Sequence, residues 1–169
     1  LVQSFANNFG LTLGNESARS ISDDGRYIVF QSTASTLVAN DTNSSGDVFR
    51  HDMLTGETIR VSVAFDGSQG NGSSFNASIS ADGNRILFSS DANNLLATAD
   101  PFGRDLFVRD INAGTTTKVN LTDAGLEVPF GGTIDFSEIS GDGTAVAFAP
   151  GVTQGYVAAD TDNIADIYV

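Results

Sequence analysis

The sequence contains no cysteine and no tryptophan, and only 3 of its 169 residues are proline. The absence of cysteine excludes a disulfide-stabilised scaffold, a thiolate zinc site and a cysteine nucleophile. Basic residues are also few, because 8 lysines and arginines stand against 21 aspartates and glutamates, for a formal net charge of −13. This charge argues against nucleic acid as a partner, since nucleic-acid phosphates require a basic surface.

Two further absences concern membranes and targeting. No apolar run approaches the roughly 18–20 residues that a membrane-spanning helix needs, so we expect no membrane span. The chain starts at Leu1 rather than at methionine, and no basic segment precedes an apolar one there. We therefore expect a processed chain or a part of a longer protein. The lack of cysteine remains compatible with secretion.

The residues that are present suffice for a folded domain. Hydrophobic residues make up 40% of the chain, which is enough for a core and excludes a disordered acidic tail. The length fits one domain of about 100–200 residues. The 18 glycines favour many tight turns over a collagen-like or low-complexity chain.

The strongest signal in the sequence is an internal repeat. A segment with Ile-Ser-x-Asp-Gly, and with phenylalanine five residues after the glycine, occurs in 20–30, 78–88 and 138–148. The turn glycines give a repeat of 58 and then 60 residues. These turn glycines are Gly25, Gly83 and Gly143. Two aspartates recur at similar spacings: Asp41 corresponds to Asp100 and Asp160, and Asp47 corresponds to Asp105 and Asp166.

Each copy is predicted to form four short strands, because β-branched and aromatic residues dominate four runs separated by turn residues. In the first copy these strands span about 17–22, 26–32, 47–52 and 57–63, with a hairpin turn at Asp24-Gly25. The second strand is apolar on both faces, whereas a sheet with one solvated face alternates apolar and polar residues. A small sheet packed between two neighbours, as in a β-propeller, has this pattern.

We therefore predict an all-β fold, a β-propeller segment of three four-stranded antiparallel blades of about 58–60 residues each. Residues 1–14 are assigned to the last strand of a preceding or closing blade and its connection. The predicted blades are 15–65, 66–125 and 126–169, the third lacking its fourth strand. Because propellers have about 4–8 blades, either the chain is part of a longer propeller or two chains combine into six blades.

The repeated residues resemble a known family. The pattern Ser-Ile-Ser-x-Asp-Gly-x-x-Ile-x-Phe, then Asp-x-Asn-x-x-x-Asp-Val-Phe from Asp41 and Asp-x-x-x-Gly-x-Thr from Asp52, resembles the WD40-like propeller repeats of TolB-like proteins. The resemblance covers nearly the whole chain. It implies a bacterial secreted, cell-surface or periplasmic protein and binding rather than catalysis, although one fold hosts many functions. The third copy departs from the pattern at Ala149-Pro150 and at 153–155, so we expect that blade to be distorted.

The loop before the third strand of each copy carries carboxylate and amide side chains, which are the oxygen donors that calcium prefers. The alternative interpretation is that these side chains hydrogen-bond the loop backbone and position the start of that strand. No glutamate closes the loop as in an EF-hand, while the excess of negative charge favours a cation. Calcium is the one candidate cofactor, and its candidate ligands are Asp41, Asn43, Asp47, Asp100, Asp105, Asp160, Asp162 and Asp166.

The other motifs receive structural interpretations. His51, the only histidine, has Arg109 as its counterpart, which favours a solvent-facing or ion-paired role over a catalytic one. Asp23 and Asp24 form a carboxylate pair, but Asp24 recurs at a turn. The stretch 67–72 lacks the lysine of a phosphate loop, and no Gly-x-Ser-x-Gly elbow is present. Six glycosylation sequons are interpreted as asparagine-rich turns: Asn15, Asn40, Asn43, Asn71, Asn76 and Asn120.

These observations predict a protein that is not an enzyme. We expect an extracytoplasmic propeller module, in the extracellular space, at the cell surface or in the periplasm, that binds a protein or a cell-surface glycan through its loops. One alternative is a structural component that forms homo-oligomers through exposed blade edges. Another is the propeller domain of a secreted hydrolase, which would show a polar cluster in the central channel.

Overall fold

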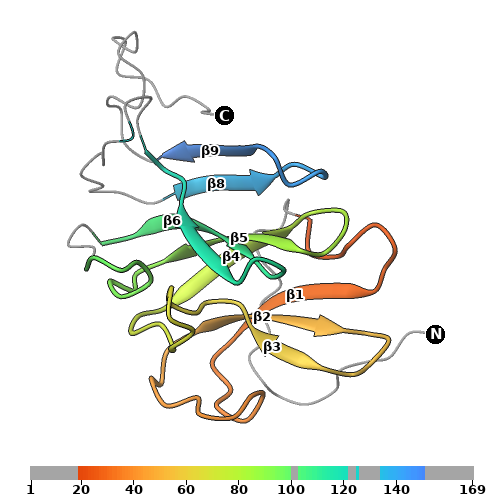
Figure 1. Cartoon of the computed structure of the whole chain (residues 1–169), viewed down its shortest axis with the longest axis horizontal. Helices are drawn as coiled ribbons and strands as arrows, with labels where there is room; N and C mark the ends of the chain where they lie inside the picture. The colour runs from red at the N-terminus through yellow and green to blue at the C-terminus, as the bar shows by residue number, and fades with distance from the viewer. Residues whose placement is uncertain (1–18, 100–102, 122–124, 126–133, 151–169) are drawn as a thin grey trace, which may run out of the picture.

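A computed structural model of the chain describes residues 19–99, 103–121, 125 and 134–150. These residues form strands in three antiparallel sheets of three, four and two strands, taken in chain order (Figure 1). The predicted all-β fold of antiparallel sheets is confirmed for this part of the chain, within which the sheets do not close into a ring. No helix of the described residues is long and apolar enough to cross a membrane.

The strands follow the sequence repeat. The first sheet contains β1 (Tyr27–Ser32), β2 (Asp47–Asp52) and β3 (Thr58–Arg60). The second sheet contains β4 (Ser74–Ile79), β5 (Arg85–Ser90), β6 (Asp105–Asp110) and β7 (Thr115–Lys118), and so has the four strands predicted for a blade. The third sheet contains β8 (Ile134–Ile139) and β9 (Val146–Pro150).

The first two sheets share the same register. Phe30 lies opposite Phe49 in the first sheet, and Phe88 lies opposite Phe107 in the second. Both pairs are stacked, with ring centroids 5.7 Å and 5.9 Å apart. The 58-residue sequence repeat is therefore a structural repeat as well.

One predicted strand differs from the structure. The first strand of the first sheet is expected over 17–22, but in the described part of that range Ile21 makes only a single bridge, to Ile28. The backbone on either side of Ile21 also pairs with β1, because the Val29 amide donates to the Ser20 carbonyl and the Ser22 amide donates to the Tyr27 carbonyl, both at 2.9 Å. The Ile79 amide donates to the Arg19 carbonyl at 2.9 Å, so the segment contacts the second sheet as well.

The strand predicted over 57–63 as the fourth of the first blade corresponds to β3. It is shorter than predicted, since β3 ends at Arg60. The Val61 and Ser62 amides both donate to the Val48 carbonyl, at 2.8 Å and 3.4 Å, which interrupts the regular ladder. The Ser62 hydroxyl then accepts from the Val48 amide at 3.1 Å, so a side chain takes over a ladder hydrogen bond.

The three sheets lie within 15–65, 66–125 and 126–169, and the blade limits themselves stay a prediction. Residues 1–14, the expected third strand of the third blade and residues 153–155, which are part of the expected distortion, lie outside the described residues. The pairing of β8 with β9 shifts register near Phe136, but β4 and β5 show a similar shift near Phe75.

The Asp-Gly turn is held by the same hydrogen bonds in all three sheets. In the third sheet the Ser140 hydroxyl donates to the Asp142 carboxylate at 2.6 Å, and the Thr144 amide donates to the same carboxylate at 3.0 Å. The same serine–aspartate bond, also 2.6 Å, joins Ser22 to Asp24 and Ser80 to Asp82. The hairpin turn predicted at Asp24-Gly25 is confirmed, because Gly25 has a φ of 71°.

These hydrogen bonds make the turns sensitive to acid. The Ser140 hydroxyl and the Thr144 amide lower the pKa of Asp142 from 3.8 to about 2. Because the pKa of Asp142 is lower in the folded state than in the unfolded state, its hydrogen bonds stabilise the fold at pH values above 3.8. This stabilisation is lost as the pH falls toward about 2. We expect a carboxyl NMR titration to show Asp142 ionising in that range and Ser140→Ala to raise its pKa. An unchanged titration in S140A would contradict this assignment.

For the second sheet, the core confirms that the second strand of the repeat has no solvated face. Ile86, Leu87 and Phe88 of β5 are each 0% exposed. Ile86 and Phe88 belong to the cluster between the first and second sheets, which also contains Val29. Leu87 belongs to the cluster between the second and third sheets, with Ile139. Burial of each such side chain contributes about 1.5–3 kcal/mol, so the second sheet is held from both sides.

A repeated contact joins each sheet to the turn of the next, and we call it the turn contact. The Tyr27 ring lies against Gly83, and the Arg50 guanidinium donates to the Gly83 carbonyl at 2.8 Å. One repeat later, the Arg85 side chain lies against Gly143 and donates to its carbonyl at 3.0 Å. The same glycine position thus receives a long side chain from the preceding sheet in both cases.

Backbone hydrogen bonds accompany the turn contacts. The Asp23 amide donates to the Ala81 carbonyl at 2.9 Å, and the Ala81 amide donates to the Gly141 carbonyl at 2.7 Å. Residues 23, 81 and 141 occupy equivalent positions in the repeat. The same backbone hydrogen bond therefore joins the first sheet to the second and the second to the third, and the three sheets stack in chain order (Figure 1).

Candidate functional site

The three predicted calcium ligands of the first repeat lie close together around an arginine. The Arg60 guanidinium, at the end of β3, places Nη2 3.3 Å from Asp41 Oδ2 and Nε 3.2 Å from Asp47 Oδ2. The Asn43 amide lies 3.5 Å from Asp47 Oδ2 and donates to the Gly70 carbonyl at 2.9 Å. A cation of the protein itself thus lies between the two carboxylates. We call Asp41, Asp47 and Arg60 the Arg60 cluster.

The Arg60 cluster is buried. The side chains of Arg60, Asp41 and Asp47 are 9%, 5% and 0% exposed. The Gln69 amide donates to Asp41 at 2.9 Å and to Asp47 at 3.2 Å, and the Ser62 hydroxyl donates to Asp47 at 2.8 Å. Burial raises the pKa of Asp47, against the opposing effects of Ser62, Arg60 and Gln69. When both carboxylates are ionised they share one guanidinium, so the cluster keeps an excess negative charge away from water.

The second repeat uses a lysine at the same place. Lys118 Nζ lies 3.0 Å from Asp105 Oδ1, and the two side chains are 4% and 1% exposed. The Asn120 side chain donates to Asp105 at 2.7 Å and accepts from the Leu106 amide at 2.9 Å. Of the remaining candidate ligands, Asp100, Asp160, Asp162 and Asp166 lie outside the described residues.

The structure therefore adds two residues that the sequence analysis missed. Arg60 and Lys118 each follow the repeated aspartate, Asp47 or Asp105, by 13 residues, and this shared spacing was the available signal. The Ser45 amide donates to the Asn43 side chain at 2.9 Å, as the turn interpretation of the loop expects. No group of three acidic, histidine or cysteine side chains suited to a metal occurs within the described ranges. Calcium binding stays a prediction.

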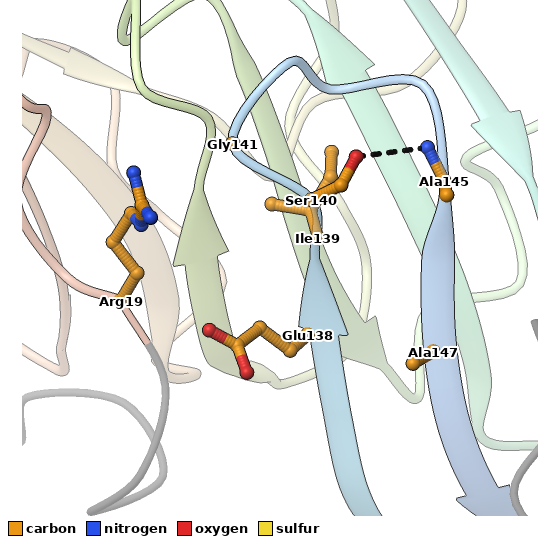
Figure 2. Close-up of a pocket in the computed structure, with 7 residues that line it drawn as sticks. All are labelled: Arg19, Glu138, Ile139, Ser140, Gly141, Ala145 and Ala147. Atoms are coloured by element: carbon orange, nitrogen blue, oxygen red, sulfur yellow. Dashed lines mark hydrogen bonds between the residues drawn. The ribbon is translucent and has the colours of Figure 1, made fainter.

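A cavity of about 290 Å³ lies where the first-strand segments of the sheets meet (Figure 2). One wall comes from β8, β9 and the turn between them, and Arg19 supplies the other. The Ser140 hydroxyl accepts from the Ala145 amide at 3.0 Å and fixes the rim. The lining residues are Arg19, Glu138, Ile139, Ser140, Gly141, Ala145 and Ala147.

The cavity carries one acid and one base among small side chains. Glu138 is paired in register with Ala147, so both project from one face of the third sheet, whereas Ile139 packs toward the second sheet. Arg19 forms an ion pair of 2.6 Å with Asp23. Glu138 forms no ion pair with a described residue, and Figure 2 shows its carboxylate on the cavity side, facing the segment that carries Arg19. Among the described residues, the site therefore combines a carboxyl group that has no ion-pair partner with a guanidinium that has one.

The structure also shows where the remaining motifs of the sequence lie. His51 Nδ1 lies 2.9 Å from the Thr58 hydroxyl, and its counterpart Arg109 donates to Thr116 at 3.1 Å. Both residues therefore join the third and fourth strands of the predicted repeat, which are β2 and β3 in the first sheet and β6 and β7 in the second. Residues 67–72 connect the first sheet to the second. Among the sequons, Asn120 is buried, Asn43 and Asn76 are half-buried, Asn40 and Asn71 are exposed, and Asn15 lies outside the described residues.

Comparisons with known proteins give likenesses to solved structures alone. No family model matches the sequence, and no curated protein matches it. Among solved structures, the chain is similar to TolB from Acinetobacter baumannii at 20% sequence identity and a TM-score of 0.45. That match covers 81% of this chain and 28% of the TolB chain. The propeller interpretation therefore depends on the repeated contacts between the sheets described above.

Proposed function

We propose that the chain is a β-propeller segment that acts as a non-catalytic binding module outside the cytoplasm. The observation that carries this proposal is the cavity between the first-strand segments, with Glu138 and Arg19 at its edge. In a propeller these inner strands surround the central channel, and the mouth of that channel is a common place for ligands.

The propeller part of the proposal is supported by the repeat. The turn contact and its accompanying backbone bonds occur between the first and second sheets and again between the second and third. A relation that repeats from sheet to sheet produces a regular stack. In addition, β5 is buried on both faces, as expected for the strand of a blade that lies between two neighbours.

The chemistry of the cavity favours a ligand with both charged and polar groups. Glu138 suits an amine or an amide donor, and Arg19 suits a carboxylate that competes with Asp23. The small side chains of Ala145 and Ala147 leave room for a backbone or a sugar ring to approach. A peptide segment, or a cell-wall glycan that carries a peptide, satisfies these requirements.

The test is an NMR titration of the whole chain with soluble muropeptides, which are short peptides linked to amino sugars. We expect saturable amide shifts at residues 19–23 and 138–147. Glu138→Gln should weaken binding about tenfold, because a charge-assisted hydrogen bond is lost. Glu57→Gln, on an exposed turn of the first sheet, is the matched control and should bind like the original chain. Saturable shifts elsewhere, or no shifts at all, would overturn the assignment of this ligand class to the cavity.

A further inference from the structure

Three asparagines tie the connection between the first two sheets to the loop after β5, and we call Asn71, Asn93 and Asn94 the asparagine clasp. The Asn71 side chain donates to Asn93 Oδ1 at 2.6 Å and accepts from the Asn93 amide at 3.0 Å. The Asn71 amide donates to Asn94 Oδ1 at 3.0 Å, and the Asn94 side chain donates to the Gln69 carbonyl at 3.0 Å. Asn71 and Asn93 are exposed to solvent.

Asn71 is followed by Gly72, and this is the one Asn-Gly pair in the sequence. An asparagine before glycine is chemically labile, because glycine has no side chain to hinder attack by its own amide nitrogen on the asparagine side chain. Gly72 makes no hydrogen bond through its amide within the described part of the chain. The nucleophile is therefore not held by another acceptor.

We propose that Asn71 is a deamidation site that the asparagine clasp keeps closed. In the reaction the Gly72 nitrogen forms a bond to Asn71 Cγ, its proton passes to the leaving amide nitrogen, and ammonia departs to leave a succinimide. Water then adds to one of the two ring carbonyls and gives aspartate or isoaspartate. The net change consumes one water and releases one ammonia, and no oxidant or reductant takes part.

The clasp opposes the first step because both polar atoms of the Asn71 side chain are engaged with Asn93. The side chain must leave these partners before Cγ turns toward the Gly72 nitrogen. The reaction rate therefore follows the population of the opened clasp rather than the exposure of Asn71 alone.

The product does not fit the closed clasp. Aspartate places a carboxylate oxygen where the amide donated, so two acceptors would face each other at the position of the 2.6 Å contact with Asn93. Isoaspartate adds a methylene to the main chain between residue 71 and Gly72, and its side-chain carboxylate no longer offers the amide that donated to Asn93. Modification therefore loosens the joint between the first and second sheets permanently.

The test follows deamidation of the whole chain at physiological temperature and mildly alkaline pH, by peptide mapping with mass spectrometry and isoaspartate detection. We expect slow reaction at Asn71 in the folded chain and fast reaction in urea. Asn93→Ala removes one hydrogen bond to the side chain and should speed the folded reaction about fivefold. The matched control Asn94→Ala leaves both side-chain bonds of Asn71 in place and should change the rate less.

Urea denaturation first confirms that both variants are folded, and three results would then contradict the proposal. Equal rates in the folded and unfolded original chain would show that the clasp gives no protection. An N93A rate equal to that of N94A would show that Asn93 is not the gate. Absence of reaction at Asn71 in urea would remove the site altogether. Any of these three results overturns the proposal.

Discussion

Replacement of Arg60 by methionine is expected to destabilise the protein by about 3–5 kcal/mol, the cost of removing one partner from a buried ion pair. Methionine keeps much of the aliphatic length but leaves Asp41 and Asp47 as carboxylates without their cation. Since Asp47 is 0% exposed, water does not compensate for the missing charge. Urea denaturation followed by circular dichroism measures the loss.

The control for this variant is Arg104→Met. Arg104 pairs with Asp91 at 2.9 Å, but the two side chains are 33% and 41% exposed. A surface pair of this kind contributes about 0–1 kcal/mol, so R104M should remain close to the original chain. If R60M loses no more stability than R104M, the Arg60 cluster does not have the buried electrostatic role assigned to it.

Comparison of R60M with the original chain also tests the calcium prediction. In R60M the carboxylates of Asp41 and Asp47 remain without the guanidinium, and carboxylate oxygens are ligands that calcium prefers. Stabilisation of R60M by added calcium would show that the loop accepts a divalent cation once the guanidinium is gone. Loss of stability of the original chain in EDTA would show that calcium binds despite Arg60.

The second large effect is expected for Gly83→Ala. Gly83 has a φ of +75°, and a Cβ atom there would lie 2.2 Å from Tyr27 Cδ2. The backbone strain costs about 1 kcal/mol and the forced displacement of the ring adds about 1–3 kcal/mol. Displacement of Tyr27 also disturbs Arg50, which donates to the Gly83 carbonyl. We expect a total loss of about 2–4 kcal/mol in urea denaturation.

Gly25→Ala is a matched control, because Gly25 occupies the same position in the first repeat. Its φ is +71°, but a Cβ atom there would meet nothing within 4 Å. We expect a loss of about 1 kcal/mol from the backbone alone. The combination of Tyr27→Ala with Gly83→Ala should cost less than the sum of the single changes, because the steric conflict is removed. Equal losses in G83A and G25A would contradict the turn contact as a stabilising element.

The sequence predicted those features that depend on local chemistry. Asp24-Gly25 and its repeats predicted the turns, and the run Ile86-Leu87-Phe88 predicted a strand buried on both faces. The predicted range 47–52 coincides with β2. In each case the residues close in the sequence supply the hydrogen bonds or the apolar pattern that defines the element.

The sequence was less informative where distant residues decide the structure. The segment around Ile21 has the composition of a strand, yet only a short part of it pairs with β1, and its backbone also contacts the second sheet through Arg19 and Ile79. The acidic loop around Asp47 gave no direct indication that Arg60 would fill it, because the two residues meet only when the strands pair. Partial sequence patterns therefore identified the loop but not the cation inside it.

The turn contact also gives the array of sheets a polarity. The first sheet contributes long side chains to the glycine turn of the second sheet, and the second sheet contributes Arg85 to the glycine turn of the third, so the contact runs in one direction. This direction makes the effect of unfolding one sheet depend on the place of that sheet in the array. A sheet that unfolds removes a long side chain from the neighbour on one side and a glycine turn from the neighbour on the other. The second sheet, which provides both halves, is then the part whose amide hydrogens exchange last with solvent.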